Sequence, residues 1–169
     1  MKTNIYVFKK AEKNSKAIFN RERERLEKAL PKYTKIEHIG STAVHGLGGK
    51  GIIDIMICAP KGGIEKIRKK LIDCGYLQRN SPDKERMFFK REFVSAGKAR
   101  RVHIHLVYSN SKNWKDALRF RDMLRDDKRL LKDYIDLKKY AFKKCKGDGE
   151  KCMKIKSEFI GKVLRDKNI

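Results

Sequence analysis

The sequence has no run of about 18 apolar residues, the length that a membrane-spanning helix needs, so no membrane span is expected. Its first residues, MKTNIYVFKKAEK, contain no apolar segment of the kind found in signal peptides, and we expect a cytoplasmic protein. The four cysteines include no CxxC pair, which argues against a zinc knuckle. Cys145 and Cys152 are close enough in sequence to form a disulfide, but a cytoplasmic location favours free thiols.

Acidic residues are also scarce. Lys and Arg total 44 whereas Asp and Glu total 21, which gives a formal net charge of +23. A charge of this size attracts polyanions such as nucleic acid, nucleotides or anionic lipid, and non-specific association with RNA is one expected outcome. A solvated Lys-rich surface would give the same composition, so the charge alone does not identify a partner.

Several motif classes are missing. Aromatic residues make up 9% of the chain and show no alternation with basic residues of the kind typical of RNP motifs. The sequence contains neither a nucleophile-elbow motif nor a Walker lysine motif. Serine-triad hydrolases and P-loop NTPases are therefore not indicated.

The hydrophobic pattern predicts helices and strands in an order typical of α+β proteins. The 169 residues suit one domain with one core, and no repeat or linker divides them. The expected elements are an extended arm at 3–8, a helix at 11–30, strands at 36–39 and 52–58, a helix at 64–73, a short strand at 76–78, a hairpin of 87–94 with 101–108, and helices at 112–125, 127–145 and 149–166. We therefore expect a small mixed sheet flanked by helices.

A glycine-rich loop between the first two predicted strands begins with Gly40, Ser41 and Thr42. Glycine permits a backbone turn that other residues resist, and the amides that follow, with the two hydroxyls, could cradle a phosphate. Ser41 could instead cap a short helix that begins at Thr42. The two interpretations are compatible, because a helix N-terminus also attracts anions.

Asp54 lies inside the second apolar run, between Ile53 and Ile55. A carboxylate there is costly to bury unless it is paired or coordinates a metal, and a paired structural carboxylate stays an open alternative. A strand, a Gly-Ser turn and a strand with an embedded Asp resemble the core pattern of nucleotidyltransferases, where the Asp holds a divalent metal. Two residues on, where most of those enzymes carry a second acid, stands Met56, whose thioether is a poor ligand for magnesium.

His103 and His105 are two residues apart on a predicted strand and so face the same side. Two imidazoles on one face can bind a metal or shuttle protons, although a purely structural pair is the alternative. By analogy with nucleotidyltransferases, where a later strand supplies a further metal ligand, we expect both to approach Asp54. We predict that these three residues and Ser41 converge in one concave site. His38 could line the same pocket or lie in the core.

The run EHIGSTAVHGLGGKGIIDI resembles the signature of the GrpB family, also called UPF0157, which usually reads HxGSTAVPGLxxKPxxDI and is a branch of the nucleotidyltransferase superfamily. HIHLV at 103–107, FRDMLR at 120–125 and KSEFI at 156–160 agree with the same family. His45 and Gly51 stand where the family usually has prolines, so the loop should be less rigid here.

The resemblance implies a nucleotidyltransferase-like core at about 1–110 and a helical extension at about 111–169. It also singles out three cations that could contact phosphate: Lys50 in the loop, Arg121 in the FRDMLR helix and Lys156 near the C-terminus. The family generally lacks the second acid as well, so the resemblance leaves open whether the chain is an enzyme.

Taken together, these features lead us to expect a protein that binds a phosphorylated ligand, namely a nucleotide with Mg2+ or another divalent ion held by Asp54, His103 and His105. An active protein would transfer a nucleotidyl group to a hydroxyl or amine acceptor. Two alternatives stay open: a non-catalytic RNA-binding protein, suggested by the net charge and the missing acid, and a metal-dependent hydrolase that uses the same residues.

Overall fold

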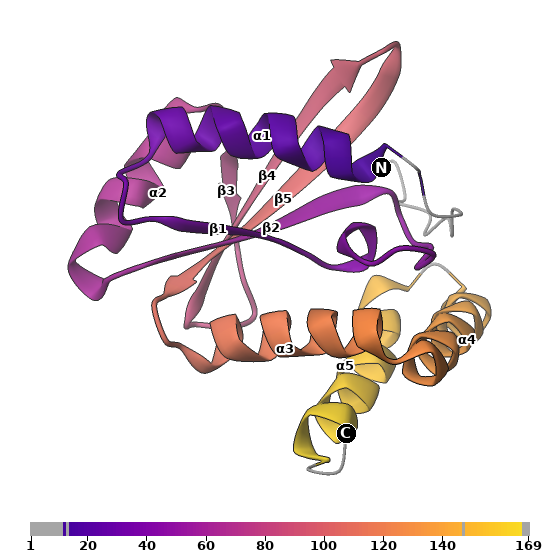
Figure 1. The fold of residues 1–169 in the computed structure, drawn as a ribbon. Coiled ribbons are helices and arrows are strands. Elements are labelled where there is room, and N and C mark those ends of the chain that lie inside the picture. Colours follow the sequence, from indigo (N-terminus) through magenta and orange to yellow (C-terminus); the bar gives the residue numbers. More distant parts are fainter. Residues whose placement is uncertain (1–11, 13, 147, 167–169) are drawn as a thin grey trace.

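The computed structural model describes residues 12, 14–146 and 148–166, which form a single sheet with helices on both of its faces (Figure 1). The predicted arm at 3–8 lies outside the described residues. The elements in chain order are α1 (Ser15–Ala29), β1 (Lys35–Ile39), the 3-10 turn η1 (Ser41–Ala43), β2 (Ile52–Ala59), the 3-10 turn η2 (Lys61–Gly63), α2 (Ile64–Asp73), β3 (Leu77–Arg79), β4 (Arg86–Ser95), β5 (Lys98–Tyr108), α3 (Lys112–Asp126), α4 (Lys128–Cys145) and α5 (Gly149–Arg165).

The five strands lie in the order β1-β2-β5-β4-β3. β2 and β5 are parallel neighbours at the centre, and the other neighbouring pairs are antiparallel. A mixed sheet, helices on both faces and three C-terminal helices confirm the predicted α+β class. The pairing of β2 with β5 is the relationship that matters for the site, because it places residues about fifty positions apart on one sheet face.

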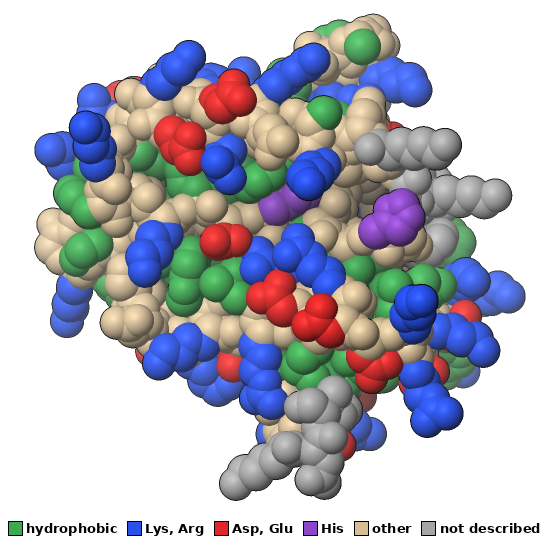
Figure 2. Space-filling model, in the orientation of Figure 1, with side chains coloured by type: hydrophobic (Ala, Val, Ile, Leu, Met, Phe, Trp, Pro, Cys, Tyr) green, Lys and Arg blue, Asp and Glu red, His purple; other side chains and the backbone are tan. Residues whose placement is uncertain are grey.

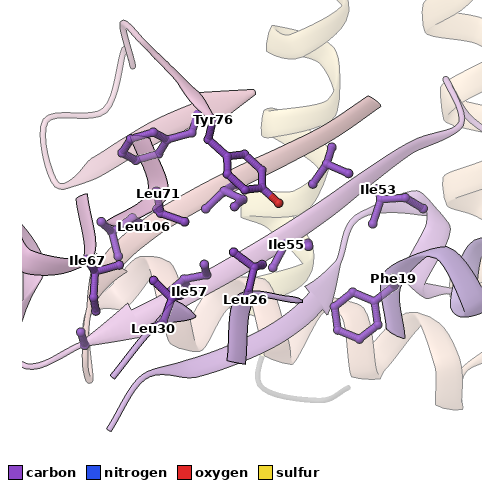
Figure 3. Close-up of a cluster of buried hydrophobic side chains, with 14 of the residues drawn as sticks. Phe19, Leu26, Leu30, Ile53, Ile55, Ile57, Ile67, Leu71, Tyr76 and Leu106 are labelled. Atoms are coloured by element: carbon purple, nitrogen blue, oxygen red, sulfur yellow. The ribbon is translucent and has the colours of Figure 1, made fainter. Parts of the chain in front are cut away.

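The two faces of the sheet differ in chemistry. The core face carries Ile53, Ile55 and Ile57 of β2 and is covered by α1 and α2, whose apolar side chains complete the main core (Figure 3). The Asp54 face carries Asp54 and Met56, which alternate with those isoleucines. On this face α3 packs Trp114, Ala117 and Leu118 against Ile39, Met56, Cys58 and Val107. The C-terminal helices thus cover only part of the Asp54 face.

A buried carboxylate ties α1 to the sheet. Glu22 is 5% exposed and accepts hydrogen bonds from the Tyr76 hydroxyl and from the guanidinium groups of Arg25, at 2.7 Å, and Arg91, at 2.9 Å. The Arg25 guanidinium also donates to the Cys74 carbonyl at the end of α2. An acid on the buried stripe of a helix is tolerated here because three donors surround it.

Local capping explains where the C-terminal helices begin. Side chains at their N-caps accept hydrogen bonds from backbone amides: Ser111 for α3, Asp127 for α4 and Asp148 for α5. Lys146, in the left-handed conformation, ends α4. Cys145 and Cys152 lie on either side of this break and are free thiols, as expected.

The β4–β5 hairpin is longer than the sequence pattern predicted. The strands run to Ser95 and from Lys98, and they are joined by a two-residue turn in which Ala96 and Gly97 both have positive φ. Such a turn matches the twist of the flanking strands. The basic run 98–101 has low strand propensity, and cross-strand pairing outweighs that propensity here.

None of the helices in the described part of the chain is long and apolar enough to cross a membrane. Lys and Arg side chains are spread over the whole visible face, with fewer acidic groups between them (Figure 2).

Candidate functional site

Asp54 and the two predicted histidines come together on the Asp54 face. The parallel register of β2 and β5 pairs Asp54 with His103 and Met56 with His105. Asp54 Oδ1 lies 3.5 Å from Nδ1 of His103 and 3.7 Å from Nε2 of His105. These distances suit electrostatic attraction and are long for a hydrogen bond. The predicted approach of both histidines to Asp54 is thus present in the structure.

The carboxylate of Asp54 stays ionised in this setting. Its side chain is 26% exposed. Burial alone would raise the pKa of Asp54, but the adjacent imidazoles of His103 and His105 hold that pKa well below its usual range. Nδ1 of His105 is buried and has no hydrogen-bond partner among the described residues. The site therefore presents a fixed negative charge beside two rings.

The Gly-Ser turn packs directly on Asp54. Gly40 has φ +71°, and a Cβ on it would lie 2.6 Å from Asp54 Oδ2, so only glycine fits without a shift. η1 begins at Ser41 with Gly40 as its N-cap, so the expected capping role of the Ser41 side chain is wrong. The Thr42 hydroxyl donates to the Ile52 carbonyl at 3.0 Å, which ties the turn to the start of β2.

The Ser41 hydroxyl instead accepts a hydrogen bond from Lys138, a residue that the sequence analysis missed. Nζ of Lys138 lies 2.5 Å from Ser41 Oγ and also donates to the Gly48 carbonyl. Lys138 is 3% exposed on α4. Burial and the charge of Lys156 lower its pKa to about 7, although Asp54 acts in the opposite direction.

Lys138 could have been found from helical spacing. The buried stripe of α4 consists of Leu130, Tyr134, Lys138, Ala141 and Cys145, so Lys138 is a cation in line with apolar residues. A lysine at such a position needs a polar partner, and the glycine-rich loop supplies two.

Two of the predicted phosphate-binding lysines lie in the same electrostatic environment. Burial lowers the pKa of Lys50, and the charges of Lys156 and Arg101 lower it further. Lys156 thus acts on both Lys50 and Lys138, which brings together cations from the loop, α4 and α5. We call these three residues the lysine cluster. Like charges held near one another favour an anion between them.

Arg121 and His38 have protein partners. The Arg121 guanidinium donates to Glu37 at 2.7 Å, to Asp122 at 2.8 Å and to the His38 carbonyl at 2.9 Å, so it holds α3 against β1. The phosphate contact of Arg121 stays a prediction. His38 lies on the core face, stacks on Phe19 with ring centroids 4.3 Å apart, and is 2.9 Å from the Thr42 hydroxyl. Burial lowers the pKa of His38 to about 4, so its imidazole is neutral at pH 7.

A cavity of about 810 Å3 lies between α1, η1 and α3. Its described lining includes His38, Ser41, Thr42 and Arg121, but not Asp54, His103, His105, Lys50 or Lys156. β1 directs His38 to the core face, whereas Asp54 lies on the other face, so the convergence of Ser41 with Asp54, His103 and His105 in one concave site stays a prediction. The Gly40–Ser41 turn borders both the cavity and Asp54.

The side chains around Asp54 offer few ligands for a divalent ion. Among the described residues, no group of three or more His, Cys, Asp or Glu side chains is arranged to hold a metal ion. Met56 is 2% exposed beneath α3, so no ligand replaces the second acid. The residues do not fit a two-magnesium centre. Magnesium is commonly held by one or two carboxylates plus substrate phosphates, and Asp54 fits that arrangement.

Comparison with known proteins identifies relatives along nearly the whole chain. The family model described as GrpB protein matches residues 6–166. The glutamate-rich protein GrpB of Alkalihalophilus pseudofirmus is 29% identical over 164 residues, covering 90% of each chain. A UPF0157 protein of Pseudomonas aeruginosa is 35% identical over 134 residues, covering 76% of this chain and 53% of its own length. The chain thus spans about half of that second relative.

Solved structures agree on the fold. The crystal structure of the conserved protein GrpB from Enterococcus faecalis superposes with a TM-score of 0.71 at 22% identity, covering 94% of this chain and 100% of that one. A structure of Cid1, described as having RNA terminal uridylyl transferase activity, has a TM-score of 0.53 at 14% identity, covering 76% of this chain and 39% of Cid1. The fold is therefore nucleotidyltransferase-like, and at these identities the likeness concerns the fold alone.

Proposed function

The chain belongs to the GrpB family, and from that premise we propose that it binds a nucleoside triphosphate at Asp54 and transfers the nucleotidyl group to a hydroxyl or amine acceptor. One observation carries the proposal: an ionised Asp54, flanked by His103 and His105, packs against a Gly-Ser turn that Lys138 of the lysine cluster also contacts. A fixed anion beside several cations suits a ligand that brings both phosphate and a divalent cation.

The lysine cluster would hold the phosphates. Lys50, Lys138 and Lys156 supply point charges from three separate segments, and the backbone and hydroxyls of Gly40, Ser41 and Thr42 supply directional hydrogen bonds. Phosphate oxygens would replace the Ser41 hydroxyl as the acceptor for Lys138. Binding therefore favours the protonated amine of Lys138, whose pKa in the ligand-free protein is about 7.

Asp54 would be the anionic ligand of a single divalent ion that enters with the phosphates, and one imidazole of the His103–His105 pair would be a neighbouring donor. Such an ion, when bound, would neutralise charge that develops on the phosphoryl oxygens. Asp54 is a poor proton acceptor, because its pKa is held low. The proton of the acceptor group would therefore go to the other imidazole of the pair, whose lone pair is not engaged by the ion.

The proposed transfer needs only the triphosphate and the acceptor as reactants. The acceptor oxygen or nitrogen bonds to the α-phosphorus, the bond from that phosphorus to the bridging oxygen breaks, and pyrophosphate leaves. Where the acceptor is water the same residues would act as a hydrolase. The two outcomes are separated by their products, a nucleotidylated acceptor in one case and a free nucleoside monophosphate in the other.

Isothermal titration calorimetry with each of the four ribonucleoside triphosphates, with and without Mg2+, tests the binding step. We expect Mg2+-dependent binding by the wild type and at least a 10-fold loss, about 1.4 kcal/mol, in Asp54→Asn. The matched control is Asp73→Asn, which removes an exposed carboxylate at the end of α2 on the other side of the sheet. Unchanged nucleotide binding in Asp54→Asn would reduce Asp54 to a structural residue.

A further inference from the structure

Part of the Asp54 face is not covered by any helix that packs on it in the described residues. Along β5 the side chains alternate, with Val102, Ile104 and Leu106 buried on the core face. Arg101, His103 and His105, which lie between them, are partly exposed on the other side. The helix contacts of α3 on this face end at Val107.

The strand register continues this uncovered surface across β4 and β3. His103 pairs with Lys90 and His105 with Phe88, and these two pair in turn with Leu77 and Arg79. Directly paired residues share a face, so all of them lie on the same face of the sheet as Asp54, one to three strands away from β2. We call Leu77, Arg79, Phe88, Lys90, Val94 and Arg101 the open strip. Leu77 is 55% exposed and Val94 is 74% exposed, as expected for a face without a covering element.

The chemistry of the open strip combines flat rings with cations. Phe88 lies with its ring centroid 5.0 Å from that of His103 and 5.4 Å from that of His105. Arg79, Lys90 and Arg101 surround these rings, and the acid that shares the strip is Glu92, paired with Arg101. Rings that accept stacking and cations that follow a backbone are the two features with which proteins hold single-stranded nucleic acid.

The open strip is continuous with the proposed nucleotide site at two points. His103 and His105 belong to the rim of the strip and also face Asp54. Arg101 lies close enough to Lys50 for its charge to act on that lysine in the glycine-rich loop. A bound strand that follows the strip therefore ends at Asp54, where an acceptor group is needed.

We propose that the open strip binds a single-stranded polynucleotide whose end lies beside Asp54, and that this strand is the acceptor of the nucleotidyl group. The second half of the inference rests on the proposed function, whereas the first half does not. Net charge complementarity favours this occupant, because the chain carries +23 and three of the six residues of the strip are cations, with Glu92 and Asp54 as the acids beside them.

Fluorescence anisotropy with labelled 12-nucleotide RNA, DNA of the same sequence and the matching duplex tests the binding surface. The test variant is Arg79→Gln/Lys90→Gln, and the control is Lys66→Gln/Lys69→Gln, which removes the same charge from exposed positions on α2. We expect the strip variant to lose about 10-fold in affinity for single strands and to flatten the logarithmic salt dependence by about 1.4, since each neutralised phosphate contributes about 0.7. The control should lose less than about 2-fold.

Phe88→Leu provides a second variant, because it keeps an apolar side chain and removes the ring. It should weaken single-strand binding by about 1 kcal/mol or more and leave the salt dependence unchanged. Equal losses in the strip and control variants, tighter binding of the duplex, or binding to anionic vesicles in place of the strands would each overturn the inference. Concentration-dependent light scattering that is lost in the strip variant would instead show that a second copy covers this face, and would overturn it too.

Asp54→Asn separates the two proposals. It should lose triphosphate binding and keep strand binding within about 2-fold, because the cations and the ring of the open strip, and not Asp54, hold the strand. Strand binding with no extension of the strand by any triphosphate would sustain the binding surface and contradict the acceptor role. If the protein binds triphosphate but does not bind single strands, the proposed function is retained and this inference is overturned.

Discussion

Lys138 on α4 donates a hydrogen bond of 2.5 Å to the hydroxyl of Ser41 in η1, and so joins two residues that are 97 positions apart. The amine is buried, and its second acceptor is the Gly48 carbonyl in the same glycine-rich loop. The bond links the C-terminal helices to the turn that packs on Asp54. A phosphate that replaced Ser41 as the acceptor for Lys138 would still connect α4 to the turn, because both would bind the phosphate.

Replacement of Lys138 should impair ligand binding as well as stability. Lys138→Met keeps the length of the side chain and fits the apolar stripe of α4, but it removes a charge-assisted hydrogen bond worth about 1.5–3 kcal/mol. We expect triphosphate affinity to fall about 10-fold or more in calorimetry. Lys139→Met, on the exposed side of the same helix, is the control and should bind as the wild type does.

The lowered pKa of Lys138 predicts that both the free energy of unfolding and the triphosphate affinity depend on pH. The pKa of Lys138 is about 7 in the folded chain, below its ordinary 10.5, so the unfolded state binds more protons between these values. The free energy of unfolding should therefore rise with pH from about 7 toward 10.5, relative to Lys138→Met. Triphosphate affinity should fall over the lower part of that range, as the amine loses its proton. Parallel pH profiles in the wild type and Lys138→Met would rule out Lys138 as the titrating group; Lys156 and Asp54 are its charged neighbours.

Gly40→Ala should disturb the site beyond its effect on the backbone. Gly40 and Gly46 both have positive φ, so alanine at either position is strained by about 1–3 kcal/mol. At Gly40 the new Cβ would also meet Asp54 Oδ2 at 2.6 Å, whereas at Gly46 it meets nothing within 4 Å. We expect both variants to lose melting temperature, Gly40→Ala by more because of this contact, and only Gly40→Ala to lose triphosphate binding. Equal binding by the two variants would contradict the contact.

Glu22→Gln should destabilise the fold without touching the site. Glu22 accepts hydrogen bonds from Tyr76, Arg25 and Arg91. Removal of its charge leaves the guanidinium groups of both arginines without an anionic partner. We expect a loss of about 2 kcal/mol in urea unfolding, within the range for a buried group left unsatisfied. Glu27→Gln, which breaks an exposed pair with Arg23, should cost less than about 0.5 kcal/mol.

The stabilisation that ionised Asp54 gains from His103 and His105 should be lost at acidic pH. Its pKa is depressed in the folded chain, so its ionisation stabilises the native state above its ordinary pKa of 3.8, and the contribution is lost as pH falls below that value. The melting temperatures of the wild type and Asp54→Asn should therefore converge between about pH 4 and pH 2. A constant difference over this range would show that the carboxylate gains nothing from His103 and His105.

The sequence was most informative where local pattern and backbone chemistry agree. Alternation predicted that His103 and His105 share a face, because a period of two leaves a strand only two choices, and the resemblance to nucleotidyltransferases predicted that this face is the one that carries Asp54. The same alternation places His38 opposite its neighbour Ile39, which packs on the Asp54 face. That placement could have been inferred, and it explains why His38 stacks on Phe19 instead of facing Asp54.

Most of the similar cations carry no signal in the sequence that shows which of them face a ligand. Lys138 is one of 44 Lys and Arg residues, and only its position on a buried stripe distinguishes it from its exposed neighbour Lys139. Arg121 matched a family motif, yet Glu37 on β1 engages its guanidinium across the α3 contact. Which cations face a ligand depends on how three helices pack, and side-chain type alone does not carry that information.

Two long-range contacts, the pairing of β2 with β5 and the packing of α4 on the glycine-rich loop, also constrain the order of the folding steps. Contacts between distant segments form late, because the chain must lose loop entropy before they stabilise it. During synthesis, a nascent chain that has emerged as far as β5 holds Asp54, His103 and His105 but lacks Lys138 and Lys156. In a refolding experiment the strand signal of circular dichroism should therefore precede the recovery of phosphate-ligand binding, which reports the completed molecule.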